Sequence, residues 1–163
     1  MSYHRLIRAL SAMLSITMLV LSLQVQAMAA TGAEKPLLGD LELMAPDGEK
    51  ISLIQYIGRK TVVVVFWATW CPICKEEVPQ LKKLNANPNL KVIAVNEGES
   101  DRKVNDFIAK NNIGYQVVMD PKASLAKAFG VPGMPYCVIL DESGVITYRN
   151  SGLPANLDTY LQH

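Results

Sequence analysis

The sequence predicts an α/β domain with a central mixed β-sheet flanked by helices. Segments with strand character alternate with segments of helical periodicity, which implies parallel strand pairing in a layered domain. Residues 61–67 form a continuous β-branched and aromatic run, typical of a strand buried on both faces. Two short strands around a turn at residues 141–144 close the domain with an antiparallel hairpin.

The first predicted elements are two short strands that form a hairpin. Residues 41–43 alternate between apolar and polar, Pro46-Asp47-Gly48 turns the chain, and residues 50–52 resume the strand. A helical turn at 53–57 then leads to the central strand at 61–67.

Helical periodicity begins directly after the central strand. Residues 71–85 place Val78, Leu81 and Leu84 on one apolar stripe, and Pro79 should kink this helix. The later elements continue the alternation, with strands at 90–95, 115–119, 136–140 and 145–149 and helices at 102–111, 124–129 and 154–163.

The composition is that of a compact domain. Half of the 163 residues are hydrophobic and 19% are charged, which excludes a disordered tail protein and allows a real core. The formal net charge of +1 shows no excess of basic residues of the kind that binds nucleic acid, so we expect no nucleic-acid partner. Three cysteines are too few for a disulfide scaffold.

The N-terminus has the order of an export signal. Residues 1–8 carry basic side chains and no acid, residues 9–23 are apolar, and Ala27 and Ala29 fit a cleavage site after position 29. An uncleaved membrane anchor is the alternative, although a span needs about 20 predominantly apolar residues and the apolar run is shorter.

The chain is thereby divided into a signal peptide or N-terminal membrane anchor at 1–29, a linker at 30–37 and one domain at 38–163. Either form of the first part places the domain in the periplasm or on the extracytoplasmic face of the membrane, because positive charge stays inside. That compartment is oxidising, so a close cysteine pair there is a structural disulfide, a metal site or a redox-active pair.

Cys71 and Cys74 lie where the central strand gives way to a helix. Their three-residue offset puts both sulfurs on one helix face. Unpaired amide groups and the positive end of the helix dipole should lower the pKa of the Cys71 thiol, while Cys74, one turn in, should be more buried. We predict that Cys71 attacks a substrate disulfide and that Cys74 then attacks Cys71 and releases the product.

Other roles for the cysteine pair are weaker. A structural disulfide that closes a loop of only four residues removes little conformational entropy from the unfolded chain. A zinc or copper site needs further ligands, yet the chain beyond position 29 has no second close cysteine pair, and its one histidine is His163. The alternative function is a copper-handling binding protein that uses Cys71, Cys74 and Met134, because thiolate and thioether ligands suit Cu(I).

Residues 66–79, Phe-Trp-Ala-Thr-Trp-Cys-Pro-Ile-Cys-Lys-Glu-Glu-Val-Pro, closely resemble the active-site signature of exported thioredoxin-like thiol–disulfide oxidoreductases of the TlpA/ResA/DsbE type. Residues 131–135 resemble the family's second landmark, a loop that ends in a cis proline, and residues 95–100 resemble a third. The resemblance implies a thioredoxin-like fold with an added N-terminal β-hairpin and a cis Met134–Pro135 bond across from Cys71.

The resemblance also implies site residues. Glu77 matches a carboxylate that the family keeps near the cysteine pair, where it takes the Cys74 proton. The alternative is that Glu77 is a solvated charge on the helix surface. In such folds the backbone before the cis proline pairs with the substrate, and the implied substrate-binding residues are Trp70, Pro72, Ile73, Met134 and Pro135.

The residues between the cysteines predict the direction of electron flow. Pro72 and Ile73 carry no cation to stabilise a thiolate, and the charge of Glu77 opposes one, so we expect a reductant of protein disulfides. A peroxidase is set aside, because Val64 and Ala68 stand where a peroxiredoxin has proline and threonine.

A reductant in an oxidising compartment needs a supply of electrons. The resemblance implies a membrane thiol carrier as the donor and no cofactor. It suggests protein disulfides as targets, such as the haem-site cysteines of apocytochrome c or the cysteines of metal-site assembly factors.

Two further residues stand close to these landmarks. Cys137 follows Pro135 by two positions, on the same side of the predicted strand, and we expect a buried core cysteine. A third redox-active thiol, or a Cu(I) ligand beside Met134, is the alternative. Glu97 ends a predicted strand, and we expect a solvated loop charge there in preference to a residue that borders the cleft.

Overall fold

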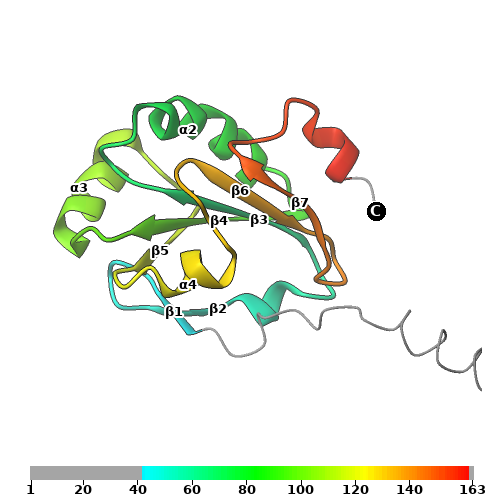
Figure 1. Cartoon of the computed structure of the whole chain (residues 1–163), viewed down its shortest axis with the longest axis horizontal. Helices are drawn as coiled ribbons and strands as arrows, with labels where there is room; N and C mark the ends of the chain where they lie inside the picture. The colour runs from blue at the N-terminus through cyan, green and yellow to red at the C-terminus, as the bar shows by residue number, and fades with distance from the viewer. Residues whose placement is uncertain (1–41, 162–163) are drawn as a thin grey trace, which may run out of the picture. The chain divides into compact units, whose positions relative to one another are not determined.

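The described chain is built around a mixed β-sheet (Figure 1). The computed structural model describes residues 42–161, so the predicted signal peptide at 1–29 and linker at 30–37 lie outside the described residues. The strands are β1 (Glu42–Met44), β2 (Lys50–Ser52), β3 (Thr61–Trp67), β4 (Leu90–Glu97), β5 (Gln116–Asp120), β6 (Tyr136–Leu140) and β7 (Ile146–Ser151). The α-helices are α2 (Pro72–Asn85), α3 (Asp101–Asn111) and α4 (Ser124–Ala128), and two 3₁₀ turns are η1 (Leu53–Tyr56) and η2 (Leu157–Tyr160).

Parallel strands form the middle of the sheet and antiparallel hairpins form its edges. The strand order is β2-β1-β5-β4-β3-β6-β7. β3 pairs in parallel with β4, from Thr61↔Leu90 to Trp67↔Asn96, and antiparallel with β6. The hairpin of β1 and β2 joins the edge next to β5, while β6 and β7 form the closing hairpin. The predicted mixed sheet and the added N-terminal hairpin are confirmed.

β3 is buried over its whole length because helices cover both of its faces. Val63, Val65 and Trp67 share one core cluster with apolar residues of α2 and α3. Phe66 points the other way and packs against Phe129, with ring centroids 5.7 Å apart. Figure 1 shows α2 and α3 on one side of the sheet and α4 on the other. This two-sided burial is what the apolar run at 61–67 predicts.

Four predicted strands, β1, β4, β5 and β7, have boundaries that are wrong by one or two residues. β4 and β5 continue farther than predicted because they stay paired as far as Glu97↔Asp120. β7 starts at Ile146 because the Val145 N–H donates to Asp141 Oδ1 (2.9 Å), which keeps Val145 in the turn. The predicted C-terminal helix is reduced to η2. Within residues 42–161 no helix has the length and hydropathy of a membrane span.

Candidate active site

Cys71 and Cys74 are joined by a disulfide at the N-terminus of α2. Cys71 is the N-cap residue with an extended backbone (φ −81°, ψ 112°), and Pro72 occupies the first turn, where its missing N–H costs nothing. The Cys74 N–H donates to Cys71 Sγ over 3.2 Å. In the reduced protein the same N–H and the helix dipole would stabilise a thiolate on Cys71. The predicted place of the pair is confirmed.

The two cysteines are equally buried, which corrects one expectation. Each residue is 4% exposed, whereas the spacing predicts that Cys74 lies deeper. Cys71 belongs to the tight turn between β3 and α2, where its N–H donates to Ala68 O (3.2 Å), so the start of the helix is itself drawn into the fold. Both cysteines belong to the core cluster of α2 and α3.

The disulfide is bordered by exposed apolar side chains. Trp70 is 63% exposed and Ile73 is 58% exposed, and Pro72 between the cysteines is also exposed. Exposed apolar side chains that lie close together are common on surfaces that bind other molecules. The predicted substrate-binding residues of this segment therefore lie on the surface beside a buried redox bond.

The Met134–Pro135 peptide bond is cis, as the resemblance implies. Phe66 pairs with Tyr136 across β3 and β6, so Pro135 lies beside the end of β3 that leads into Cys71. Met134 is partly buried against the cluster that holds both cysteines. The fold thus brings Met134 and Pro135 to the same edge of the sheet as the disulfide.

Glu77 lies on α2 and is half-buried, so it is not a fully solvated charge. Its Oε1 accepts the Leu153 N–H (2.9 Å), and its Oε2 is buried without a hydrogen-bond partner among the described residues. Burial raises the pKa of this carboxyl, against the lowering effect of the Leu153 hydrogen bond. Gly152 has a left-handed backbone (φ +70°), which favours glycine, and a Cβ there would lie 3.0 Å from Oε1, so that the Glu77 carboxylate would have to move slightly.

Cys137 is fully buried on β6, which confirms the predicted core cysteine. Burial, together with the charge of Glu77, raises the pKa of this thiol to about 12. A neutral thiol without solvent access is a poor nucleophile. In the described part of the chain, no three His, Cys, Asp or Glu residues are grouped so that they could hold a metal ion.

Glu99 is a site neighbour that the sequence interpretation missed. Its carboxylate accepts the Thr69 N–H and the Thr69 hydroxyl (2.6 Å each) and an Asn96 amide hydrogen (2.8 Å), and it pairs with Lys103 Nζ (2.6 Å). Burial alone would raise its pKa, but the hydrogen bonds from Asn96, Lys103 and Thr69 outweigh burial and lower the pKa to about 2. Glu97 is the last residue of β4 and is partly buried, so the expected solvated loop charge is wrong. Its side chain makes no hydrogen bond or ion pair within residues 42–161.

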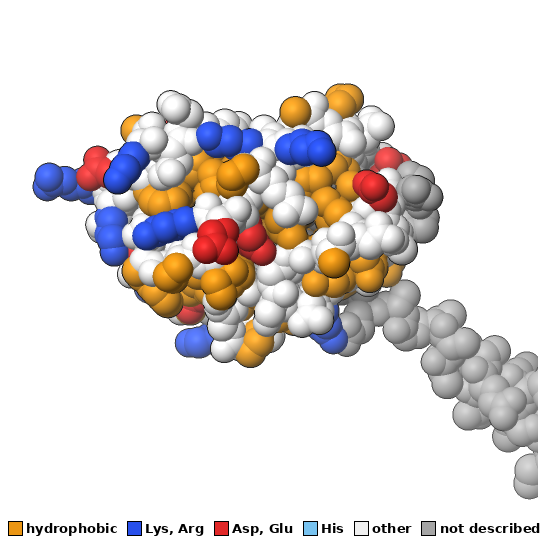
Figure 2. Space-filling model, turned by 90° about the horizontal axis from the view of Figure 1, so that it is seen from above, with side chains coloured by type: hydrophobic (Ala, Val, Ile, Leu, Met, Phe, Trp, Pro, Cys, Tyr) orange, Lys and Arg blue, Asp and Glu red, His pale blue; other side chains and the backbone are white. Residues whose placement is uncertain are grey.

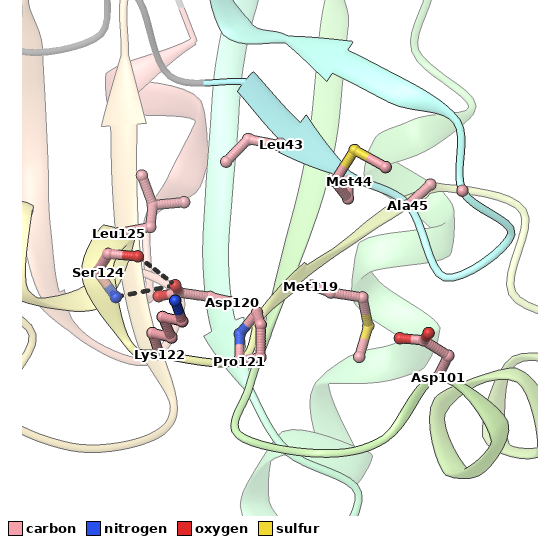
Figure 3. A pocket seen from close by; sticks show the side chains of 11 residues that line it. Leu43, Met44, Ala45, Asp101, Met119, Asp120, Pro121, Lys122, Ser124 and Leu125 are labelled. Carbon is pink, nitrogen blue, oxygen red and sulfur yellow. Dashed lines mark hydrogen bonds between the residues drawn. The ribbon is translucent and has the colours of Figure 1, made fainter.

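A pocket of about 420 Å³ is lined by residues of β1, of β5 and of the segment that leads from β5 into α4 (Figure 3). None of the predicted site residues lines it. The buried Asp120 carboxylate is turned toward α4, where it accepts the N–H groups of Ser124 and Ala126 (2.9 Å each). This carboxylate is therefore engaged within the fold, and Asp101 and Lys122 are the other charged residues that line the pocket.

Charges of both signs are mixed on the face in Figure 2. Lys and Arg side chains alternate there with Asp and Glu and with separate apolar patches. This face has no extended field of one sign, in agreement with the balance of 16 basic and 15 acidic residues.

The sequence of this chain is similar to a known protein family and to individual proteins of known type. The family described as Redoxin matches residues 24–160. The chain is 36% identical over 112 residues to the Sporulation thiol-disulfide oxidoreductase A of Bacillus subtilis, covering 65% of this chain and 67% of that protein. It is 30% identical over 109 residues to the Thiol-disulfide oxidoreductase ResA of Halalkalibacterium halodurans, covering 65% of this chain but only 61% of that protein.

Solved structures share the fold. StoA from Bacillus subtilis superimposes with a TM-score of 0.62 at 28% identity, over 76% of this chain and 95% of that one. A protein described as a putative thiol:disulfide interchange protein DsbE, from Chlorobium tepidum, gives a TM-score of 0.66 at 27% identity, over 75% of this chain and 88% of that one.

Proposed function

Because this chain belongs to the Redoxin family, we propose that it is an extracytoplasmic thiol–disulfide oxidoreductase that reduces protein disulfides. The predicted resemblance is confirmed by the family match and by relatives named thiol–disulfide oxidoreductases. The observation that carries the proposal is the Cys71–Cys74 disulfide at a helix N-terminus, where the Cys74 N–H meets Cys71 Sγ. A thiolate placed there exchanges bonds with other disulfides.

The proposed reaction uses the reduced cysteine pair. The Cys71 thiolate attacks one sulfur of a substrate disulfide, that disulfide breaks, and the departing substrate sulfur takes up a proton. Cys74 then loses its proton and attacks Cys71 Sγ, which breaks the mixed disulfide and releases the second substrate thiol. Two electrons pass to the substrate, and the Cys71–Cys74 disulfide of the described structure remains.

Glu77 is our proposed acceptor of the Cys74 proton. It follows Cys74 by three residues on α2, so both side chains lie on one helix face. Burial raises the pKa of Glu77 above its ordinary value, which favours the uptake of a proton. Its unpartnered Oε2 provides a free acceptor atom.

Glu77→Gln is expected to slow the release of the mixed disulfide by roughly a hundredfold near pH 7. The difference in release rate between the variant and the parent protein should decrease at alkaline pH, where Cys74 loses its proton to solvent. Stopped-flow measurement of single-turnover product release between pH 6 and 10 checks this. A deficit that stays constant over this range would contradict the proton-acceptor role.

The stability of Glu77→Gln supplies the control. Glutamine still accepts the Leu153 N–H. Because the folded-state pKa of Glu77 is raised, its contribution to stability is present below the unfolded pKa and is lost as pH rises through the folded pKa. The variant should therefore melt no lower than the parent protein at pH 7, so that slow turnover there is not a sign of unfolding.

The direction of electron flow is proposed from the residues beside the sulfurs. Pro72 and Ile73 provide no cation, and Glu77 opposes a thiolate, so the reduced pair is not strongly stabilised. We expect a reduction potential below about −200 mV in a glutathione titration, on the reducing side of protein disulfide isomerase. A potential above about −170 mV would make the protein an oxidant.

The surroundings of the reaction are proposed from the N-terminal sequence and the family. The order of residues 1–29 supports a periplasmic or membrane-facing location. The proposed electron donor is a membrane thiol carrier, which is suggested by the family resemblance alone. Cytochrome c maturation and metal-site assembly are the candidate processes, because both require cysteines to be kept reduced. Tight stoichiometric copper in equilibrium dialysis, without reduction of insulin disulfides, would favour the copper-handling alternative.

A further inference from the structure

The turn before Cys71 is held by one carboxylate from a distant loop. Ala68–Cys71 is closed by the Cys71 N–H donating to Ala68 O (3.2 Å). This bond leaves the Thr69 N–H unpaired within the turn, and Glu99 accepts both that N–H and the Thr69 hydroxyl at 2.6 Å. Glu99 thus binds both polar hydrogens that Thr69 directs away from the turn.

The carboxylate is fixed from its other side as well. Asn96, which is fully buried at the end of β4, donates to Glu99 Oε2 (2.8 Å). Lys103 on the first turns of α3 pairs with Oε1 (2.6 Å). The Glu99 side chain is only 5% exposed, and its pKa of about 2 keeps it ionised at any physiological pH. Hydrogen bonds to a shielded carboxylate are stronger than those between neutral groups.

We propose that Glu99 is a positioning residue for disulfide exchange, which fixes the Ala68–Cys71 turn and thereby holds the Cys71 sulfur at the N-terminus of α2. The step that benefits is the attack by Cys71, so this inference rests on the proposed function. Thr69 is the residue through which Glu99 acts. Trp70 is exposed in the same turn.

Positioning and charge predict opposite effects on Cys71. A negative charge near a thiol disfavours the thiolate, so removing the charge of Glu99 would by itself move Cys71 ionisation to lower pH. Loosening the turn would weaken the contact of the sulfur with the helix N-terminus and move ionisation to higher pH. The sign of the change therefore distinguishes the two roles.

The test uses three variants of the full chain. Glu99→Gln removes the charge and leaves one acceptor oxygen where the carboxylate has two. Thr69→Val removes the hydroxyl hydrogen bond with no change of charge. Glu97→Gln is the matched control, since it removes the same charge two residues away, at the end of β4, but breaks no side-chain contact within residues 42–161.

The main readout is the alkylation rate of reduced Cys71 with iodoacetamide as a function of pH. This measurement needs no disulfide substrate, so it tests the inference even if the proposed reductase activity fails. We expect the midpoint of the profile to move to higher pH in Glu99→Gln and in Thr69→Val, and kcat/KM for insulin-disulfide reduction to fall about tenfold in both. Glu97→Gln should leave the rate within about twofold.

Three results would overturn the proposal. A midpoint at lower pH in Glu99→Gln would assign a purely electrostatic role. An unchanged midpoint in both Glu99→Gln and Thr69→Val, whatever their melting temperatures, would assign a role in folding alone. A change in Glu97→Gln equal to that in Glu99→Gln would show that the contact with Thr69 has no part in the effect.

Discussion

Replacing Cys71 with serine is expected to abolish the reduction of protein disulfides, with a loss of at least about a thousandfold. The thiolate is the nucleophile in disulfide exchange, and a serine hydroxyl neither ionises near neutral pH nor forms a disulfide with the substrate. The N-cap contact would survive, because a hydroxyl oxygen also accepts the Cys74 N–H. The fold should therefore persist while the chemistry is lost, and insulin-disulfide reduction with dithiothreitol measures this.

Cys137→Ala is the matched control for that variant. It also removes one thiol, but from a fully buried position whose pKa is raised to about 12. The control should retain activity within about twofold, with a modest loss of stability from the vacated space. Activity that survives Cys71→Ser, or is lost in a folded Cys137→Ala protein, would contradict the assignment of Cys71 as the attacking sulfur.

The features that the sequence predicts well are those encoded by neighbouring residues. The apolar run 61–67 requires burial on both faces, and β3 has those bounds. The spacing of Cys71 and Cys74 after this run places the pair at a helix start, where the structure has it. The cis bond before Pro135 comes from the family resemblance, because local composition alone is also compatible with an ordinary proline at a strand start.

The features that escape prediction depend on residues far apart in the sequence. Thr69 and Glu99 are 30 positions apart and meet because β3 and β4 are parallel neighbours whose ends carry these loops. Glu77 and Leu153 are 76 positions apart, and their contact depends on how the chain leaves β7. A single sequence shows which acids are present but not which backbone N–H each one meets.

The equal burial of the two cysteines has the same origin. Helical spacing predicts depth relative to the helix axis, so Cys74 is expected to lie deeper than Cys71. The turn that precedes α2 changes this, because the Cys71 N–H is bonded back to Ala68 at the end of the buried strand. The depth of a residue at a helix start is set by the element before it.

Cys74→Ser should convert the protein from a catalyst that turns over into one that stalls on its substrate. Cys71 can still attack, since its helix N-terminus and the Cys74 backbone N–H are unchanged. The mixed disulfide then has no neighbouring thiolate to resolve it, and Cys137 is buried and neutral at physiological pH. We expect most of the reduced variant to be captured as a covalent adduct when it is mixed with a disulfide-bonded protein, while multiple turnover falls to background.

Non-reducing electrophoresis and mass spectrometry of the adduct measure this, and the control variants locate the bond. Cys74→Ser combined with Cys137→Ala should trap the same partners, whereas Cys74→Ser combined with Cys71→Ser should trap none. An adduct that persists without Cys71, or rapid turnover by Cys74→Ser, would show that the sulfur at the helix start is not the point of attack. In the expected outcome, partners recovered from a cell extract distinguish the candidate processes by their own chemistry. Haem-site cysteines would indicate cytochrome c maturation and clustered metal-binding cysteines would indicate metal-site assembly, because the trapped bond forms only with a disulfide that Cys71 can reach.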